Sequence, residues 1–412
     1  MDSNSFMKKV QDKFDFPIIL WKEGEVSFFA PDLSIYEQKD YPPSRFPVFY
    51  NPMMVINRDL TVLLIKSWIQ SIEDKDIKFG EPLCGIGIRG LRILKEIGNI
   101  DVHLNDFNEL SIKLLEDNLK FNKCEEEIKK YNLDANEFMN LSAKPRERFT
   151  ILDLDPFGSP VRFVDSAIRA LLGSKGLLCI SATDLVPLVG IYKKACFRKY
   201  GIYPIKTEYS HELALRILLT FVIREAAKHD IGLNILFSYY HQHHIRCFVE
   251  TNKGKLNANA SLKGLGFIHH CFNCNERFIS PRGTKQLTHC EACNSELNSI
   301  GPIWIGKLFD DDILMKMNEE IENCKFNNDK KVKKLLNTII EEKDAPITFH
   351  DTSRLMYEHK LKSKKLIDII EGLQKKGYTC TKTHFSPISI KTNAPRLQIV
   401  EVIKNLESKI IL

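Results

Sequence analysis

Residues 77–90 read Ile77-Lys-Phe-Gly-Glu-Pro-Leu-Cys-Gly-Ile-Gly-Ile-Arg-Gly90, which predicts a short strand, a glycine turn and the start of a helix. Gly85, Gly87 and Gly90 satisfy the pattern G-x-G-x-x-G. Glycines in such a turn let the backbone approach a ligand closely, and the free N–H groups at the helix start suit a carboxylate or a phosphate. The stretch therefore predicts a nucleotide-binding turn in an α/β sheet. The pattern alone leaves a dinucleotide cofactor open.

Two acids follow this turn in the chain. The segment Asp101-Val-His-Leu-Asn-Asp106 predicts a second strand, and Asp106 at its end suits two ribose hydroxyls. Asp134 and Ala135 come after a helical stretch and offer a further acid for an adenine edge. Each acid taken singly is more often a solvated cap or turn residue than a ligand-binding group. Their order after a glycine turn is typical of class I methyltransferases, which use S-adenosyl-L-methionine.

The run Ile151-Leu-Asp-Leu-Asp-Pro-Phe-Gly-Ser159 predicts a strand that ends in a carboxylate, a proline and an aromatic ring. These groups suit an exocyclic base amine, because Asp155 and the Pro156 carbonyl can accept its N–H bonds while Phe157 stacks on the base. We expect Asp155 to be the catalytic group and Asp153 its structural partner. The alternative is an ordinary turn in which an Asp caps a helix and a Phe fills the core.

The sequence resembles the tRNA guanine-26 N2-dimethyltransferase family over most of its length. The resemblance implies transfer of one or two methyl groups from S-adenosyl-L-methionine to the N2 of guanine 26 in tRNA. It departs from the family at Cys84-Gly-Ile-Gly87, where Ser-Ala-Thr-Gly is usual, and at Ser389, where a glycine is usual. The segments that carry the resemblance are residues 49–59, 153–160, 181–187, 301–306, 383–387 and 390–395.

The resemblance also implies roles for single residues. Arg58 and Arg89 are expected near the methionyl end of the cofactor, where a guanidinium forms bidentate bonds with a carboxylate. Phe49 is expected to enclose the guanine together with Phe157. The alternatives are two surface arginines at helix starts and a core aromatic. The implied cofactor site consists of Arg58, Glu81, Gly85, Gly87, Arg89, Asp106, Asp134 and Ala135.

Four of the eleven cysteines are spaced as Cys271-x2-Cys274 and Cys290-x2-Cys293, with fifteen residues between the pairs. Two tight turns with two thiolates each complete a tetrahedral zinc site that is closed to solvent, so the spacing predicts a structural zinc ion. A redox pair or a chance pattern is the alternative. The odd number of cysteines favours reduced thiols elsewhere in the chain.

Composition limits the class of protein. The chain has 412 residues, 43% of them hydrophobic, and a net charge of +6, which favours polyanionic partners only weakly. Two lysine-rich stretches, residues 330–334 and 360–365, suit phosphate contacts with tRNA, although solvated helix faces explain either stretch alone better. No apolar run reaches the length of a membrane span, and the N-terminus lacks a secretory pattern. We expect a cytoplasmic monomer that does not enter membranes.

Three domains are expected. Residues 1–55 form an extended, proline-punctuated entry segment with a short strand pair. Residues 56–255 form a Rossmann-like class I methyltransferase sheet. Residues 256–412 form an α+β tRNA-binding domain with the zinc module and a winged-helix-like end, in which two helices precede a hairpin.

Two further functions stay open on the sequence. An adenine N6 methyltransferase also fits Asp-Pro-Phe, although the entry segment and the C-terminal segments argue against it. A zinc-containing RNA-binding protein without catalytic activity is the other possibility, with a nicotinamide nucleotide or no ligand at the glycine turn. Stabilisation by S-adenosyl-L-methionine but not by NAD would argue against this second possibility.

Overall fold

The computed structural model describes the chain except residues 1–2, 35–45, 73–75, 286, 328 and 409–412. The described residues divide into two compact units. The first unit comprises residues 1–181, 248–252 and 312–334, and the second comprises residues 182–247, 253–311 and 335–412. The units take segments from distant parts of the chain, whereas the three expected domains follow chain order. No helix in the described residues combines the length and hydropathy needed to cross a bilayer.

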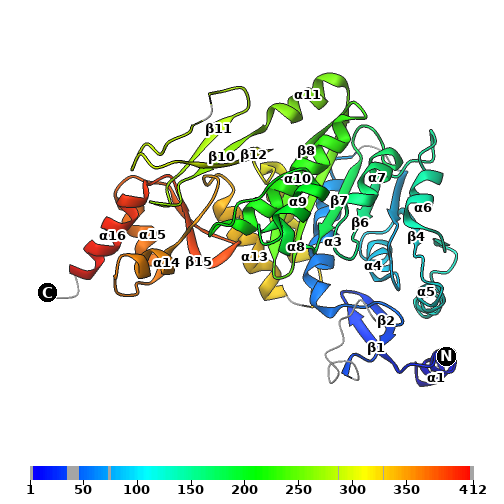
Figure 1. The fold of residues 1–412 in the computed structure, drawn as a ribbon. Helices are drawn as coiled ribbons and strands as arrows, with labels where there is room; N and C mark the ends of the chain where they lie inside the picture. The colour runs from blue at the N-terminus through cyan, green and yellow to red at the C-terminus, as the bar shows by residue number, and fades with distance from the viewer. Residues whose placement is uncertain (1–2, 35–45, 73–75, 286, 328, 409–412) are drawn as a thin grey trace. The chain divides into compact units, whose positions relative to one another are not determined.

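Parallel strands form the centre of the first unit (Figure 1). They pair in the order β5-β4-β3-β6-β7, and the strand order continues through β9 to β8. Strands β6 and β7 are buried at every residue, as expected where a parallel sheet is covered on both faces. The predicted Rossmann-like sheet is confirmed. The bounds are β3 Ile77–Glu81, β4 Ile100–Asn105, β5 Ile128–Tyr131, β6 Ile151–Leu154, β7 Leu177–Ala182, β8 Ile231–His241 and β9 His244–Lys253.

Helix α3 (Val55–Ile69) is buried on almost all sides and packs against α4 (Ile88–Glu96). A helix that is apolar all round belongs in a core, so its polar residues Asn57, Asp59 and Thr61 need partners inside the protein. The other helical elements of this unit are η2 Pro52–Met54, α5 Glu109–Phe121, α6 Ala135–Leu141, η3 Val161–Phe163, α7 Val164–Ala170 and η4 Ile321–Asn323. Helices α12 (Asp311–Glu320) and α13 (Asp329–Glu342) each have residues in both units.

The N-terminal segment is only partly extended. The expected strand pair is present as β1 (Ile18–Glu23) and β2 (Val26–Pro31). The expectation of an extended segment was wrong for its first residues, which form helix α1 (Ser3–Gln11). Phe6 of this helix stacks on Phe29 at 5.7 Å between ring centroids, so burial of an aromatic side chain favours the helix.

The second unit contains long helix α10 (Ser210–Ala227) and two small antiparallel sheets. One sheet has the order β11-β10-β12, and the other has the order β13-β15-β14. Helices α14 and α15 precede strands β14 and β15, so the predicted order of two helices and a hairpin is present. The remaining bounds are α8 Leu185–Leu188, α9 Lys193–Tyr200, α11 Lys255–Lys263, β10 Leu265–His270, β11 Arg277–Pro281, β12 Asn298–Trp304, β13 His350–Asp351, α14 Thr352–Glu358, α15 Leu366–Lys375, β14 Cys380–Thr383, β15 Ser386–Thr392 and α16 Arg396–Ser408.

Candidate active site and zinc centre

Three loops of the first unit follow neighbouring parallel strands. The glycine turn follows β3, Asp106 follows β4, and Asp155 follows β6. Strand β3 lies between β4 and β6 and pairs with both. Because parallel strands end at the same edge of a sheet, the fold brings these three loops together.

The glycine turn has the backbone geometry that its sequence predicts. Gly85 and Gly87 have φ angles of +54° and +77°, a region that side-chain-bearing residues rarely adopt. A Cβ on Gly87 would lie 2.3 Å from the Leu115 side chain, so only glycine fits there. The Gly85 N–H donates to Asp106 Oδ2 at 2.8 Å, which joins the turn to the second strand.

Asp106 is held in place by two backbone groups. Its other oxygen, Oδ1, accepts from the Asn108 N–H at 2.9 Å. Burial raises the pKa of Asp106, and these two hydrogen bonds partly oppose the rise. Each carboxylate oxygen has a second lone pair, so the group can still accept hydrogen bonds from two hydroxyls.

Asp134 is the N-cap of α6. Its Oδ1 accepts from the Asn136 N–H at 2.8 Å and the Glu137 N–H at 3.4 Å. The helix cap considered as an alternative is therefore present. Ala135 is the first residue of α6 and is buried. Capping uses one of the two carboxylate oxygens, so it does not prevent a ligand contact.

Arg89 is the centre of the most highly charged group of side chains at this edge. We name Arg89, Glu81, Asp153 and Asp155 the Arg89 cluster. The guanidinium, 4% exposed, donates to Glu81 Oε1 at 3.1 Å and to Asp153 Oδ2 at 3.2 Å, and it forms an ion pair with Asp155. The side chain of Asp155 is 13% exposed. Arg89 is therefore not the surface arginine considered as an alternative.

The Arg89 cluster has three carboxylates for one cation. Burial raises the pKa of Glu81, Arg89 opposes this rise, and Asp153 and Asp155 add to it by repulsion. A protonated Glu81 would reduce the repulsion between the acids. The cluster thus has a surplus of negative charge, which suits a positively charged ligand.

Arg58 already has a carboxylate partner. Its Nε and Nη2 donate to both oxygens of Glu23, at 2.7 and 2.6 Å, and Tyr50 Oη donates to the same carboxylate at 2.9 Å. We did not predict a role for Glu23. Arg58 is placed beside the entry segment by this pair, and its Nη1 has no hydrogen bond with any described residue.

Asn57 and Thr61 were also missed. Arg89 Nη1 donates to Asn57 Oδ1 at 2.9 Å and to Thr61 Oγ1 at 3.1 Å. Both residues are fully buried in α3. A signal was present, because polar residues interrupt an otherwise apolar helix at these positions.

Phe49 and Phe157 are in contact. Their ring centroids are 4.4 Å apart and the planes meet at 81°. A base between two parallel rings requires a separation of about 7 Å, twice the contact distance of carbon atoms. The two rings are thus brought together as predicted, but they have to separate before a base can enter. Phe157 is 59% exposed and precedes Gly158, which has a φ of +73°.

The four predicted zinc ligands converge in the second unit. All four sulfur atoms lie within 4.8 Å of one another, and the pairs Cys271–Cys293 and Cys274–Cys290 are 3.5 Å apart. A tetrahedral zinc site with bonds of about 2.3 Å needs sulfur atoms roughly 3.8 Å apart, whereas a disulfide needs about 2.05 Å. The set fits zinc.

The two cysteine turns have the same backbone pattern. The N–H of Asn275 donates to the Cys271 carbonyl at 2.8 Å, and the N–H of Asn294 donates to the Cys290 carbonyl at 2.8 Å. Both asparagines have positive φ angles, 57° and 56°. Asparagine tolerates this conformation, which turns two sulfur atoms toward one point.

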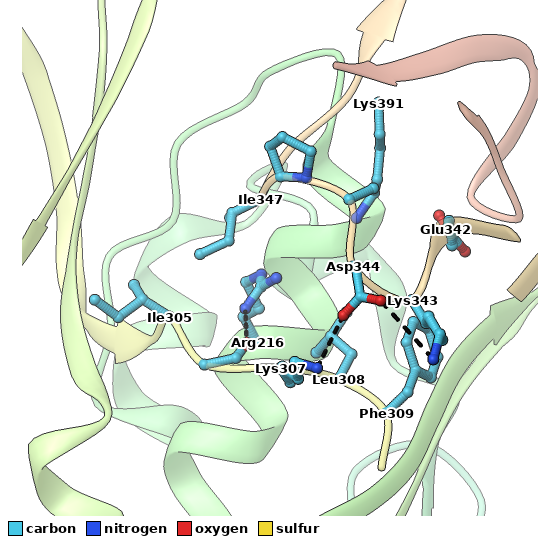
Figure 2. A pocket seen from close by; sticks show the side chains of 13 residues that line it. Arg216, Ile305, Lys307, Leu308, Phe309, Glu342, Lys343, Asp344, Ile347 and Lys391 are labelled. Atoms are coloured by element: carbon cyan, nitrogen blue, oxygen red, sulfur yellow. Dashed lines mark hydrogen bonds and ion pairs between the residues drawn. The ribbon is translucent and has the colours of Figure 1, made fainter. Parts of the chain in front are cut away.

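The second unit also has a cavity of about 210 Å³ (Figure 2). Two of its buried charged residues, Arg216 and Lys391, belong to a group that we name the Glu212 cluster, formed by Glu212, Arg216 and Lys391. The buried Glu342 also lines the cavity. Arg216 donates to Glu212 Oε1 at 2.8 Å, and Lys391 lies 3.0 Å from Oε2. Burial by itself would raise the pKa of Glu212, but Lys391 and Arg216 outweigh it and lower the pKa to about 2.

Comparison with known proteins places these observations in a family. The family model described as N2,N2-dimethylguanosine tRNA methyltransferase matches residues 25–404. A tRNA (guanine(26)-N(2))-dimethyltransferase of Methanobrevibacter smithii is 36% identical over 90% of this chain and 95% of its own length. The Pyrococcus horikoshii enzyme of that name is 35% identical over 93% of this chain and 98% of its own. The structure of Trm1 from Pyrococcus horikoshii with S-adenosyl-L-methionine has a TM-score of 0.80 and 32% identity, over 93% of this chain and 99% of that one.

Proposed function

The chain belongs to the N2,N2-dimethylguanosine tRNA methyltransferase family, and from that membership we propose which of its residues carry out the reaction. The protein is a tRNA methyltransferase that uses S-adenosyl-L-methionine and acts on the exocyclic N2 of guanine 26. Asp155 is the catalytic residue, and Pro156, Phe157 and Phe49 bind the guanine. The Arg89 cluster is the observation that supports this assignment, because it places Asp155 at the carboxyl edge of the sheet beside the glycine turn.

The cofactor site lies along the same edge. When it is bound, S-adenosyl-L-methionine supplies a methyl group on a positively charged sulfur. We assign the methionyl end to Arg58, Glu81 and Arg89, and the surplus of carboxylates in the Arg89 cluster suits a cation. The remaining residues of the proposed site are Gly85 and Gly87 in the turn, Asp106 at the ribose, and Asp134 and Ala135 at the adenine.

Asp155 orients the amine and removes its proton. Guanine N2 is a poor nucleophile because its lone pair is delocalised into the ring. The Asp155 carboxylate and the Pro156 carbonyl accept the two N–H bonds and hold the nitrogen with its lone pair directed at the methyl donor. The methyl group would bond to N2 as its bond to the sulfonium sulfur breaks, which would leave a neutral thioether and move the positive charge to N2. Asp155 then accepts a proton from N2. One N–H then remains, so the same carboxylate can present the amine for a second methylation.

Arg89 is a positioning residue for this step. Its guanidinium stays ionised throughout the working pH range and holds Asp155 by an ion pair. Burial lowers the pKa of Arg89, but Asp153, Asp155 and Glu81 outweigh that effect and raise it. The aromatic rings of Phe49 and Phe157 separate to admit the base, which has to leave its stack because a stacked N2 is unreachable.

The experiment is methylation with labelled S-adenosyl-L-methionine and unmodified tRNA, followed by digestion and identification of the nucleosides. We expect N2-methylguanosine and N2,N2-dimethylguanosine at one position. N6-methyladenosine would support the adenine alternative instead. Cofactor binding without incorporation would contradict the assignment of tRNA guanine as the substrate.

We further propose that residues 256–412 bind tRNA, with the zinc module and the lysine-rich stretches 330–334 and 360–365 contacting phosphates. Zinc would stabilise the β10-β11-β12 sheet, since Cys271 and Cys274 follow β10 directly. Metal analysis should find one zinc ion per chain in the wild type and none after Cys274→Ser, whereas Cys324→Ser should keep the ion. We also propose that the protein is a cytoplasmic monomer, because tRNA is its substrate and the chain is long enough to bind RNA alone.

A further inference from the structure

An exposed aromatic pair lies on and beside helix α9. The rings of Phe197 and Tyr203 stack with centroids 4.2 Å apart and planes at 15°. The two residues are 46% and 55% exposed, and Tyr192 at the start of the helix is 63% exposed. Three exposed aromatic residues within twelve positions bury little apolar area, so folding does not explain them.

Helix α9 is held in place by its other face. Cys196 and Tyr200 are four residues apart and are both buried. Tyr200 Oη donates to Asp184 Oδ1 at 2.7 Å, and Lys199 Nζ lies 2.9 Å from Oδ2 of the same carboxylate. The outward face of the helix, with Phe197, is therefore presented on a fixed backbone.

The same segment is strongly basic. Residues 185–207 contain five lysines and arginines and neither aspartate nor glutamate. Lys199 is paired with Asp184, while Lys193, Lys194 and Arg198 are exposed and make no ion pair with any described carboxylate. A set of unpaired cations beside stacked aromatic rings is complementary to a polyanion with accessible bases.

We propose that this surface, formed by Tyr192, Lys193, Lys194, Phe197, Arg198 and Tyr203, binds the tRNA substrate. The cations contact phosphates, and the Phe197–Tyr203 pair stacks on an unpaired base of the RNA. The inference rests on the proposed function. RNA is favoured over a protein partner because lysine is depleted at protein interfaces, whereas phosphate contacts require it. We name these six residues the α9 surface.

The first experiment changes the charge. Lys193→Gln, Lys194→Gln and Arg198→Gln are combined, and Lys120→Gln, Lys144→Gln and Lys255→Gln serve as the matched control, since these three exposed lysines also make no ion pair with a described residue. Binding of an unmodified tRNA transcript is measured at several salt concentrations. We expect Kd to rise about tenfold or more for the α9 variant only, and the salt slope to fall by roughly 2. An equal effect in both variants would overturn the proposal.

The second experiment changes the aromatic pair. Phe197→Ala combined with Tyr203→Ala should weaken tRNA binding by about tenfold, because base stacking contributes on this order. Phe197→Tyr keeps an aromatic ring and should retain tRNA binding. In the double alanine variant, the affinity for S-adenosyl-L-methionine and the kcat at saturating tRNA should both stay at wild-type values. Unchanged tRNA binding in the double variant would contradict the inference. Absence of methylated guanosine with wild-type enzyme would instead contradict the proposed function.

Discussion

The Arg89 cluster of the first unit and the Glu212 cluster of the second are both buried and charged, but they are balanced in opposite directions. The Arg89 cluster has one cation and three carboxylates, and the pKa of Glu81 is raised by burial and by its acidic neighbours. The Glu212 cluster has one carboxylate and two cations, and its carboxylate has a lowered pKa despite burial.

The two clusters differ in where their surplus charge finds its partners. The extra cation of the Glu212 cluster is satisfied inside the protein, because Arg216 also donates to the Trp304 and Gly306 carbonyls at 3.1 and 3.0 Å. The extra acids of the Arg89 cluster lie at the sheet edge, with Asp155 partly exposed. A buried surplus of like charge destabilises a fold and is common at functional sites. We infer that the first cluster serves binding and catalysis and the second serves stability.

The largest expected effect is on catalysis by Asp155. Asp155→Ala should lower kcat by about a thousandfold, because a positioned proton acceptor contributes on this order. Binding of S-adenosyl-L-methionine should be retained, and stability should not fall, since one repelling acid is removed. Single-turnover methylation and calorimetric binding check both points. Near-wild-type turnover would disprove the assignment of Asp155.

In the Glu212 cluster we expect a substitution to lower the stability of the protein. Glu212→Gln leaves Arg216 and Lys391 buried without their carboxylate, so the free energy of unfolding should fall by about 3 kcal/mol. Asp344→Asn, which affects an exposed ion pair with Lys307, is the control and should change it by less than about 1 kcal/mol. Urea denaturation measures both. Equal stability of Glu212→Gln and wild type would remove the difference between the clusters.

The difference in stability between wild type and Glu212→Gln should depend on pH in one direction. The pKa of Glu212 is lowered from 4.5 to about 2 in the folded protein, so its ionised form stabilises the fold above pH 4.5. The stability gap between wild type and Glu212→Gln should be full at pH 7 and should shrink as pH falls from 4.5 toward 2. A gap that stays constant over this range would show that the ionised carboxylate is not its cause.

A smaller effect is expected from Phe157, the exposed aromatic residue that we propose binds the guanine. Phe157→Leu should raise KM for tRNA about tenfold, because a flat ring that stacks on a base is lost. Phe157→Trp keeps a flat ring and should keep most of the affinity. Steady-state kinetics with varied tRNA separates KM from kcat. Similar KM values for the two variants would argue against stacking.

The smallest effect is expected from Glu81. Its pKa is raised in the folded protein, so the folded state holds a proton that the unfolded state loses above pH 4.5. Stability should therefore decline as pH rises above 4.5, and Glu81→Gln should make this decline shallower. Thermal denaturation from pH 5 to pH 9 measures the slopes. If Glu81→Gln left the slope unchanged, Glu81 would not be the residue of the Arg89 cluster that holds the extra proton in the folded protein.

Much of the fold was predictable because its signals are local. The strand, turn and helix of residues 77–90, the second strand before Asp106 and the strand pair of the entry segment were all predicted correctly. Helix α1 was missed because its burial depends on aromatic residues far along the chain, such as Phe121. The contacts of Glu23, Asn57 and Thr61 were missed because their arginine partners, Arg58 and Arg89, lie 28 to 35 residues away.

The sequence by itself determined the family, the order of the glycine turn, Asp106 and Asp155, and the four cysteines. The glycine turn and each cysteine pair depend on spacing within a few residues, where backbone geometry decides which groups can meet, and the order of the two acids can be read along the chain. Only the tertiary structure decided that Arg89 pairs with Asp155, 66 residues away, and Arg58 with Glu23, 35 residues away. Such pairs form when packed strands and helices bring distant loops together and exclude water. No local rule of spacing contains that information.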